Sequence, residues 1–234
     1  MRKCRVCELG RTDYVTALGI QQQLISERKQ GSIDDHLLLL EHPHVITMGR
    51  NGRPENLLAS AEILDRAGIS FHSTDRGGDI TYHGPGQLVG YPILDLRDWK
   101  RDVGAYVRAI EQVIIGLLAD YGIAAGRIPR LTGVWVNERK IAAIGVHISR
   151  WVTSHGFALN VDPDLSYFQY IVPCGLTKPV TSMSELGVRA KMEDVRQRLA
   201  THFGRTFECE MMMEAAVPDR ANGVPSGVVA LRQA

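Results

Sequence analysis

The chain has 234 residues, 44% of them hydrophobic, and its 27 lysines and arginines against 26 aspartates and glutamates give a formal net charge of +1. The length fits one domain with a sizeable core, and the balanced charge argues against nucleic-acid binding driven by bulk charge. The sequence contains no run of about 18 apolar residues, so no membrane span is expected. Residues 1–3 are basic but no apolar signal core follows, so we expect a cytoplasmic protein.

Apolar runs and helical spacing predict alternating strands and helices in the first half of the chain. A helix is expected over 12–30, where Val15, Leu18, Gln22 and Ile25 recur at helical spacing before Gly31. Ser60 is expected to cap a second helix that ends near residue 66. Strands are expected at 4–9, 36–41, 45–48, 69–73 and 88–94.

In the second half of the chain, the clearest predicted helix spans 103–121 and follows an Asp102 cap. A later helix is expected over 192–203, ended by Gly204. Strands are expected at 133–136, 140–148, 155–161 and 207–211. Interleaved strands and helices with central hairpins predict an α/β (α+β) domain with a mixed sheet flanked by helices. We place this single domain at 1–214 and expect a flexible tail at 215–234.

The segment 76–87 is the most informative feature of the sequence. It holds four glycines, one proline, Arg76 and His83 within twelve residues. Glycines uncover backbone amides, arginine offers a fixed fork of donors, and histidine titrates near neutrality. Because apolar runs flank it, we expect an ordered loop that lines a site.

Cys174 stands between Pro173 and Gly175, a context typical of a sharp turn. The local residues are equally compatible with a nucleophile and with a small buried side chain. Lys140 is a candidate cation beside a thiolate, although these residues alone favour an ordinary hairpin lysine. His83, His147 and His155 are alternative bases, and the sequence does not rank them.

Two further patterns leave alternatives open. Cys4 and Cys7 form a CxxC that fits a zinc or redox pair, but no second pair exists and a strand is expected there, so structural roles are favoured for both, as for Cys209. Glycine and alanine within the strands fit either a narrow slot for an unbranched aliphatic chain or tight sheet packing. These small residues are Ala142, Ala143, Gly145, Gly156 and Ala158.

Seven segments in fixed order carry a resemblance over about 37–186: 38–43, 47–50, 76–87, 133–136, 140–146, 155–161 and 171–175. Together they resemble the octanoyltransferases of lipoate biosynthesis, also called lipoyl(octanoyl) transferases. The resemblance implies the fold of biotin and lipoate protein ligases. It also implies one catalytic domain that moves an octanoyl group from acyl carrier protein to a lysine of a lipoyl domain, through a cysteine thioester.

The resemblance assigns roles to individual residues. It implies that Cys174 is the acyl-accepting nucleophile and that Lys140 stabilises its thiolate and exchanges protons. The implied substrate-binding residues are Arg76, Gly77, Gly78, Asp79, Ile80, Thr81, Tyr82, His83, Ala143, Ile144, Gly145, Gly156, Phe157 and Ala158. We expect no cofactor beyond the phosphopantetheine that the substrate carries, no metal, and a monomer.

The resemblance also implies partners and rivals. Expected partners are acyl carrier protein, the lipoyl domains of 2-oxoacid dehydrogenase E2 subunits and the glycine cleavage H protein, with no nucleic acid or membrane. Because acyl carrier protein is acidic, a basic patch is expected, with Arg50, Arg53, Arg76 and Lys178 as candidates. Rival interpretations are an ATP-dependent lipoate or octanoate ligase, a thioester hydrolase, and a non-catalytic cofactor-binding module.

Overall fold

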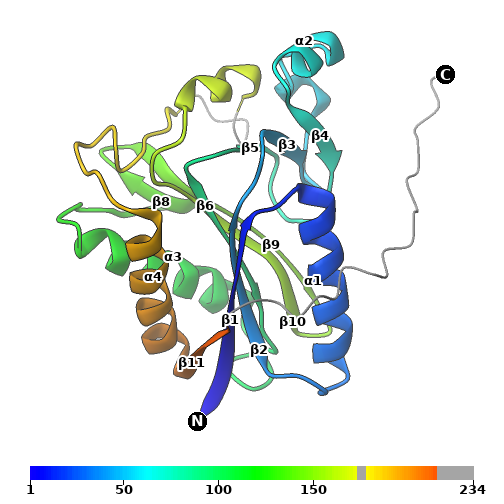
Figure 1. Ribbon diagram of the computed structural model, residues 1–234, viewed down its shortest axis with the longest axis vertical. Coiled ribbons are helices and arrows are strands. Elements are labelled where there is room, and N and C mark those ends of the chain that lie inside the picture. The colour runs from blue at the N-terminus through cyan, green and yellow to red at the C-terminus, as the bar shows by residue number, and fades with distance from the viewer. Residues whose placement is uncertain (173–177, 215–234) are drawn as a thin grey trace.

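The computed structural model describes residues 1–172 and 178–214 (Figure 1). The predicted nucleophile Cys174 and the predicted tail 215–234 lie outside these described residues. The elements in chain order are β1 (Arg2–Arg11), α1 (Tyr14–Lys29), β2 (Asp35–Glu41), β3 (Val45–Met48), η1 (Pro54–Asn56), α2 (Ala61–Arg66), β4 (Ser70–Ser73), β5 (Ile80–His83), β6 (Gln87–Ile93), α3 (Val103–Ala119), β7 (Gly126–Ile128), β8 (Leu131–Val136), β9 (Arg139–Ser149), β10 (Val152–Asn160), η2 (Leu165–Tyr170), α4 (Met192–Phe207) and β11 (Cys209–Glu214).

The described strands form two sheets, which confirms the predicted mixed α+β architecture. The larger sheet has eight strands in the order β11-β1-β2-β6-β10-β9-β8-β7, and the smaller has the order β4-β3-β5. β1 lies parallel to both β11 and β2, whereas the pairs from β2 to β7 are antiparallel. The prediction that 1–214 form one catalytic domain stays a prediction.

Helices cover both faces of the large sheet, with α3 and α4 on one face and α1 on the other (Figure 1). The four consecutive leucines of β2 show why the middle of that strand is continuously apolar. Leu37 and Leu39 pack in the core under α3 and α4, and Leu38 and Leu40 pack under α1. Because a strand alternates its side chains between two covered faces, a continuous apolar run is what this position requires. Within the described residues, no helix has the length and apolar character needed to cross a bilayer.

The buried face of α1 differs from the predicted one. Tyr14, Ala17, Gln21 and Leu24 are buried, one position before the predicted series, and Val15 is 49% exposed. The apolar periodicity indicated the wrong face because two of the buried positions, Tyr14 and Gln21, carry polar groups. Gln21, for example, is buried because its Oε1 accepts a hydrogen bond of 2.8 Å from the His155 N–H.

The predicted end of the last helix and the predicted loop at 76–87 also differ from the structure. α4 continues past Gly204 to Phe207 and ends at Glu208, which adopts a left-handed backbone with φ 54°. Phe207 is fully buried against Phe203, so its packing outweighs the helix-stopping tendency of glycine. The predicted loop 76–87 contains the strand β5, which pairs antiparallel with β3. A four-residue strand between glycines has too few residues for a clear pattern.

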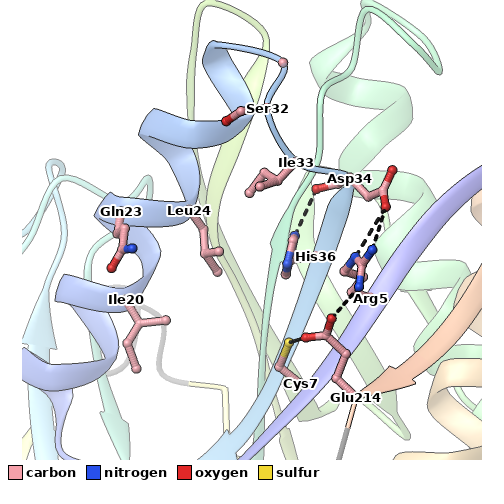
Figure 2. Close-up of a pocket in the computed structure, with 11 residues that line it drawn as sticks. Arg5, Cys7, Ile20, Gln23, Leu24, Ser32, Ile33, Asp34, His36 and Glu214 are labelled. Carbon is pink, nitrogen blue, oxygen red and sulfur yellow. Dashed lines mark hydrogen bonds and ion pairs between the residues drawn. The ribbon is translucent and has the colours of Figure 1, made fainter. Parts of the chain in front are cut away.

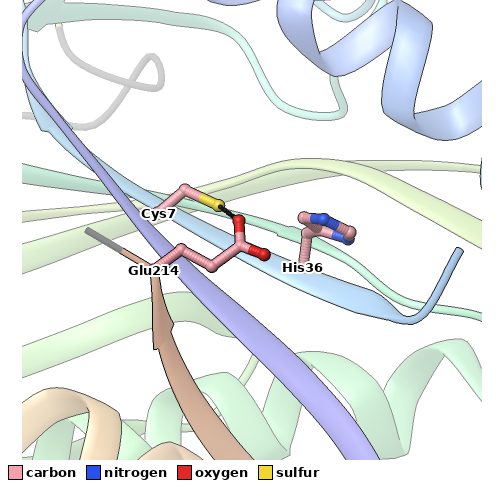
Figure 3. A group of neighbouring side chains, drawn as sticks. All are labelled: Cys7, His36 and Glu214. Atoms are coloured by element: carbon pink, nitrogen blue, oxygen red, sulfur yellow. Dashed lines mark hydrogen bonds between the residues drawn. The ribbon is translucent and has the colours of Figure 1, made fainter. Parts of the chain in front are cut away.

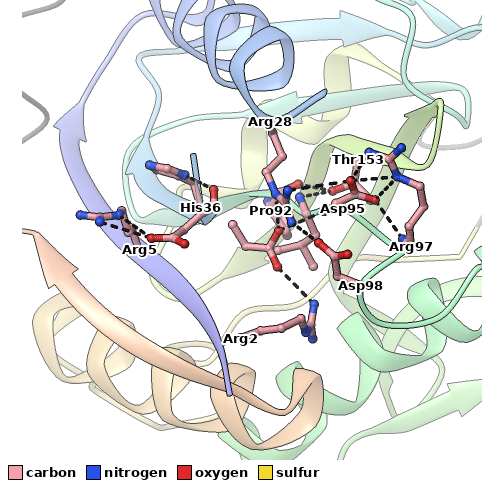
Figure 4. Close-up of polar contacts among 12 residues, drawn as sticks. Arg2, Arg5, Arg28, His36, Pro92, Asp95, Arg97, Asp98 and Thr153 are labelled. Carbon is pink, nitrogen blue, oxygen red and sulfur yellow. Dashed lines mark hydrogen bonds and ion pairs between the residues drawn. The ribbon is translucent and has the colours of Figure 1, made fainter. Parts of the chain in front are cut away.

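A charged network joins α1 to β2 and to the chain after β6 (Figure 4). The Asp35 carboxylate, 2% exposed, accepts hydrogen bonds from Arg28 Nε at 2.9 Å and from the Asp95 N–H at 3.0 Å. Arg2 Nη1 lies 3.2 Å from the other Asp35 oxygen. Burial raises the pKa of Asp35, and the two arginines oppose that shift. Each buried charge of the network therefore has a polar partner.

Candidate functional site

A cleft with a volume of about 610 Å³ opens between the glycine-rich segment and the start of β9. Gly77, Gly78 and Asp79 line one side, and Lys140 lines the other together with residues 143–146. Asn51, Arg53, Glu55, Asn56, Arg130 and Thr132 also line it. The volume is within the range of about 300–1,000 Å³ that is typical of small-molecule sites.

A small apolar slot of about 40 Å³ adjoins this cleft. Gly78, Ala143, Ile144 and Gly145 line both cavities, so they separate the slot from the cleft. The other predicted substrate-binding residues that line the slot are Arg76, Thr81, His83, Gly156, Phe157 and Ala158. Three segments far apart in the sequence thus meet at one place.

Ile80 and Tyr82 belong to the predicted set but face away from the slot. Because β5 alternates its side chains, Thr81 and His83 face the slot, and Ile80 and Tyr82 pack in the core of the small sheet. The Tyr82 hydroxyl bonds His44 Nδ1 at 2.7 Å. The side chains of Ile80 and Tyr82 therefore support the site from behind.

The glycine pair Gly145 and Gly156 lies in register across β9 and β10. A Cβ on Gly145 would lie 2.8 Å from the carbonyl oxygen of Gly77, and the Gly77 N–H donates to the Val146 carbonyl at 2.9 Å. A Cβ on Gly156 would collide with the Gly90 carbonyl of β6. Both glycines therefore permit close backbone approach, and Gly145 brings the glycine-rich segment onto the sheet.

Arg76 is buried with 8% exposure, so it does not belong to the basic surface patch proposed from sequence. Its Nη2 donates to the Thr47 carbonyl at 2.6 Å and its Nη1 donates to the Gly77 carbonyl at 3.2 Å. The guanidinium therefore fixes the glycine-rich segment to β3. Burying a charged guanidinium costs free energy unless its N–H donors form hydrogen bonds, and these contacts supply such bonds.

Asp79 organises the rim of the cleft. Its Oδ1 accepts hydrogen bonds from the Ile80 N–H at 2.7 Å and from the Arg53 N–H at 3.1 Å. Its Oδ2 accepts one from the Asn56 side chain. The carboxylate thus joins the glycine-rich segment to the chain around η1.

Lys140 is 8% exposed, and its Nζ lies 4.9 Å from the centre of the Trp135 ring. Its backbone N–H donates to the Pro179 carbonyl, and its carbonyl accepts from the Thr181 N–H, both at 2.9 Å. On the other side of residues 173–177, the Val172 N–H donates to the Asn56 carbonyl at 2.8 Å. The described chain on both sides of 173–177 is therefore anchored to residues that line the cleft.

The three candidate histidines have different surroundings. His83 Nδ1 donates to Gln87 Oε1 at 2.7 Å, and burial together with the nearby His42 lowers the pKa of His83 to about 3. His83 is therefore neutral at pH 7. His147 and His155 both contact the Asp75 carboxylate, at 2.5 and 2.7 Å. His155 is nearly buried and borders the slot, whereas His147 does not line it.

A hydrogen-bond relay connects His83 to the chain beside Lys140. Gln87 Nε2 donates to Asn160 Oδ1 at 2.9 Å, and Asn160 Nδ2 donates to the Thr181 carbonyl at 2.9 Å. Thr181, Asn56 and Arg130 were not singled out from sequence. Arg130 and Thr181 lie outside helices and strands, and Asn56 lies in the three-residue η1, so no periodicity marked them.

Comparison with known proteins agrees with this geometry. Residues 13–204 match the family model for the lipoyl protein ligase A/B catalytic domain. An octanoyltransferase of Solibacter usitatus is 73% identical over 217 residues, which cover 93% of this chain and 99% of the relative. The chain therefore belongs to the octanoyltransferases within the lipoyl protein ligase A/B family, and it is an acyltransferase.

Solved structures with lower identity share the fold. A lipoate-protein ligase A bound with ATP gives a TM-score of 0.79 at 17% identity, covering 94% of this chain and 91% of that one. A bipartite lipoate protein ligase of Thermoplasma acidophilum, described with its E2 lipoyl domain, gives 0.75 at 16% identity, covering 94% and 89%. These likenesses confirm the predicted ligase-like fold.

Proposed function

We propose how this chain carries out the octanoyl transfer that its family membership assigns. The donor is octanoyl-acyl carrier protein. The acceptor is a lysine of lipoyl domains in 2-oxoacid dehydrogenase E2 subunits and of the glycine cleavage H protein. The convergence of Lys140, the glycine-rich segment and both flanks of 173–177 on one cleft supports this proposal. We further propose a cytoplasmic monomer that uses no cofactor of its own and no metal in catalysis.

In the first step, the Cys174 thiolate attacks the carbonyl carbon of the octanoyl thioester. A new C–S bond forms, the C–S bond to phosphopantetheine breaks, and the departing sulfur takes a proton from the Lys140 ammonium. The positive charge of Lys140 stabilises the attacking thiolate beforehand. The reaction does not require free energy from ATP, because one thioester replaces another.

In the second step, the acceptor amine attacks the octanoyl-cysteine. Neutral Lys140 accepts one amine proton, the amide C–N bond forms, and Cys174 leaves as a thiolate. Both groups then have their starting protonation states.

The octanoyl tail is proposed to enter the slot behind Gly145. At about 40 Å³ the slot holds a few water molecules at most, so an eight-carbon chain must move its walls apart. The apolar side chains of Ile144 and Phe157 border it. Tail binding is therefore expected to be coupled to a small rearrangement of these side chains.

Basic side chains at the cleft are proposed to receive the acidic acyl carrier protein. Arg53 and Arg130 line the cleft and are exposed. Arg50 is also exposed, and its Nη2 lies 3.4 Å from His147 Nε2. Lys178 is half-buried with its Nζ 3.5 Å from Glu138. Opposite charges on the two proteins would speed association more than they raise affinity.

The test is intact-mass measurement after mixing the protein with octanoyl-acyl carrier protein. We expect one octanoyl group on the wild type and on the Cys209→Ser control, and none on Cys174→Ser. An octanoylated Cys174→Ser protein would contradict the assignment. Release of free octanoate without an amine acceptor would favour the hydrolase interpretation.

A second arm addresses the ligase interpretation. The protein is incubated with free octanoate, ATP and a lipoyl domain. The solved ligase structures described above are below 25% identical and show the fold alone. We expect no transfer from the free acid, and transfer at a rate comparable to that from the thioester would overturn the proposal.

A further inference from the structure

A third cavity, of about 430 Å³, lies on the α1 face of the sheet between α1 and the strands β1, β2 and β11 (Figure 2). Ile20 and Leu24 of α1 form an apolar wall, together with Ile33. The opposite side carries the side chains of Arg5, Cys7, Asp34, His36 and Glu214. None of these residues takes part in the proposed transfer.

Three of these side chains offer donor atoms for a metal ion. Cys7 Sγ, a ring nitrogen of His36 and a carboxylate oxygen of Glu214 all lie within 4.8 Å of one another (Figure 3). The Cys7 thiol donates to Glu214 Oε2 at 3.3 Å. Cys7 is 2% exposed and His36 7% exposed, so two of the three donors are buried.

Strand register brings these residues together. Cys7 of β1 is paired with Glu214 of β11 on one side and with Leu38 of β2 on the other. His36 is two residues before Leu38, so it lies on the same face of β2. Cys4 is three residues before Cys7 and packs on the opposite face, under α3 and α4. The CxxC therefore does not present both sulfurs to one site.

The surrounding contacts orient the donors as a metal site requires. His36 Nδ1 donates to the Asp34 carbonyl at 2.9 Å, which leaves Nε2 with its lone pair. A ligating histidine typically donates its other ring N–H to a carbonyl or carboxylate in this way. Arg5 Nη1 donates to Glu214 Oε1 at 2.6 Å, so Oε2 remains directed to Cys7.

We propose that Cys7, His36 and Glu214 form a zinc-binding site whose fourth position opens into the cavity. A thiolate with an imidazole suits zinc, whereas calcium and magnesium take oxygen ligands. Zinc–ligand distances of about 2.0–2.3 Å imply donor separations of roughly 3.3–3.8 Å, so small side-chain rotations suffice. On binding, the Zn–S bond forms and the thiol proton goes to solvent.

The local charges are compatible with a dication. With zinc bound and Cys7 deprotonated, the thiolate and the carboxylates of Asp34 and Glu214 balance the zinc and Arg5. The ion would tie β11 to β1 and β2, where the last described strand of the chain ends. This site goes beyond the proposed transferase function and does not rest on it. It would replace the structural role predicted for Cys7 from sequence.

The test titrates the metal-stripped full chain with zinc in competition with a chromophoric chelator. We expect one zinc per chain, at least 100-fold weaker binding in Cys7→Ser and His36→Ala, and about 10-fold weaker binding in Arg5→Gln. The controls Cys209→Ser and Cys174→Ser should bind as the wild type does. Wild-type-like binding in both ligand variants, loss of binding in Cys174→Ser, or no zinc binding by the wild type would overturn the proposal.

A spectroscopic measurement on the unmodified protein does not depend on the folding of variants. Cobalt substituted at this site should give a thiolate-to-cobalt charge-transfer band at one equivalent. X-ray absorption at the zinc edge should find one sulfur among the ligands. A zinc shell of oxygen and nitrogen alone would contradict the site, whatever the variants show.

Discussion

The main chains of Lys140 and Thr181 are hydrogen-bonded, with the Thr181 N–H donating to the Lys140 carbonyl at 2.9 Å. Thr181 also accepts the side-chain amide of Asn160 through its carbonyl. The position of Lys140 at the cleft therefore depends on the chain that follows residues 173–177, as well as on β9.

Replacing Lys140 by methionine should raise the pH at which iodoacetamide alkylates Cys174, by about one to three units, because in the proposed dyad the lysine ammonium stabilises the thiolate. Octanoyl transfer should fall by about 10²–10⁴-fold. Peptide mapping after alkylation separates Cys174 from the other three cysteines. The matched control is the exposed Lys100→Met, and an unchanged alkylation profile in Lys140→Met would argue against the dyad.

The relay through Asn160 should stabilise the site. Asn160→Leu leaves the Thr181 carbonyl and one buried donor of Gln87 with fewer partners, and we expect the free energy of unfolding to fall by about 1–3 kcal/mol. Urea denaturation measures the change, with the exposed Gln22→Leu as control. A decrease in the free energy of unfolding no larger than that of the control would show that the relay does not stabilise the fold.

The slot is expected to select the acyl chain. Ala143 lines both the cleft and the slot, so Ala143→Leu should raise the KM for octanoyl donors about tenfold or more and favour shorter chains. Steady-state kinetics with a series of acyl-acyl carrier proteins checks this. Exposed Ala119→Leu is the control, and unaltered chain-length preference in Ala143→Leu would place the tail elsewhere.

Buried histidines should make the protein sensitive to acid. Burial lowers the pKa of His42 from 6.5 to about 4, although the hydrogen bond from its Nδ1 to the Thr12 carbonyl opposes this shift. The unfolded chain binds this proton near pH 6.5 and the folded chain does not. The stabilisation is therefore fully present above about pH 6.5 and is lost as the pH falls towards 4.

Chemical denaturation at several pH values measures this effect. Each such histidine contributes a slope of at most about 1.4 kcal/mol per pH unit, and His83 adds a second contribution that extends towards pH 3. In His42→Gln the slope between pH 4 and 6.5 should be shallower. An equal slope in the variant and the wild type would contradict a neutral buried His42.

Several features followed from the sequence by itself, because they depend on local periodicity and on an ordered set of motifs. The α3 helix was predicted with its Asp102 cap, which accepts the Ala105 N–H at 2.8 Å. β3 matches its predicted bounds. The motif order identified the family, and the glycine-rich segment predicted to line a site does line the cleft.

Tertiary structure alone decided which residues share a cavity and which face of an element is buried. Arg76 appeared to be a surface cation, yet it lies under the glycine-rich segment because Thr47, 29 residues away, supplies its acceptors. The sequence favoured a structural role for Cys7 and named no partner for it, whereas strand register places it beside Glu214, 207 residues later. Such contacts arise from strand order and register, which local sequence does not encode.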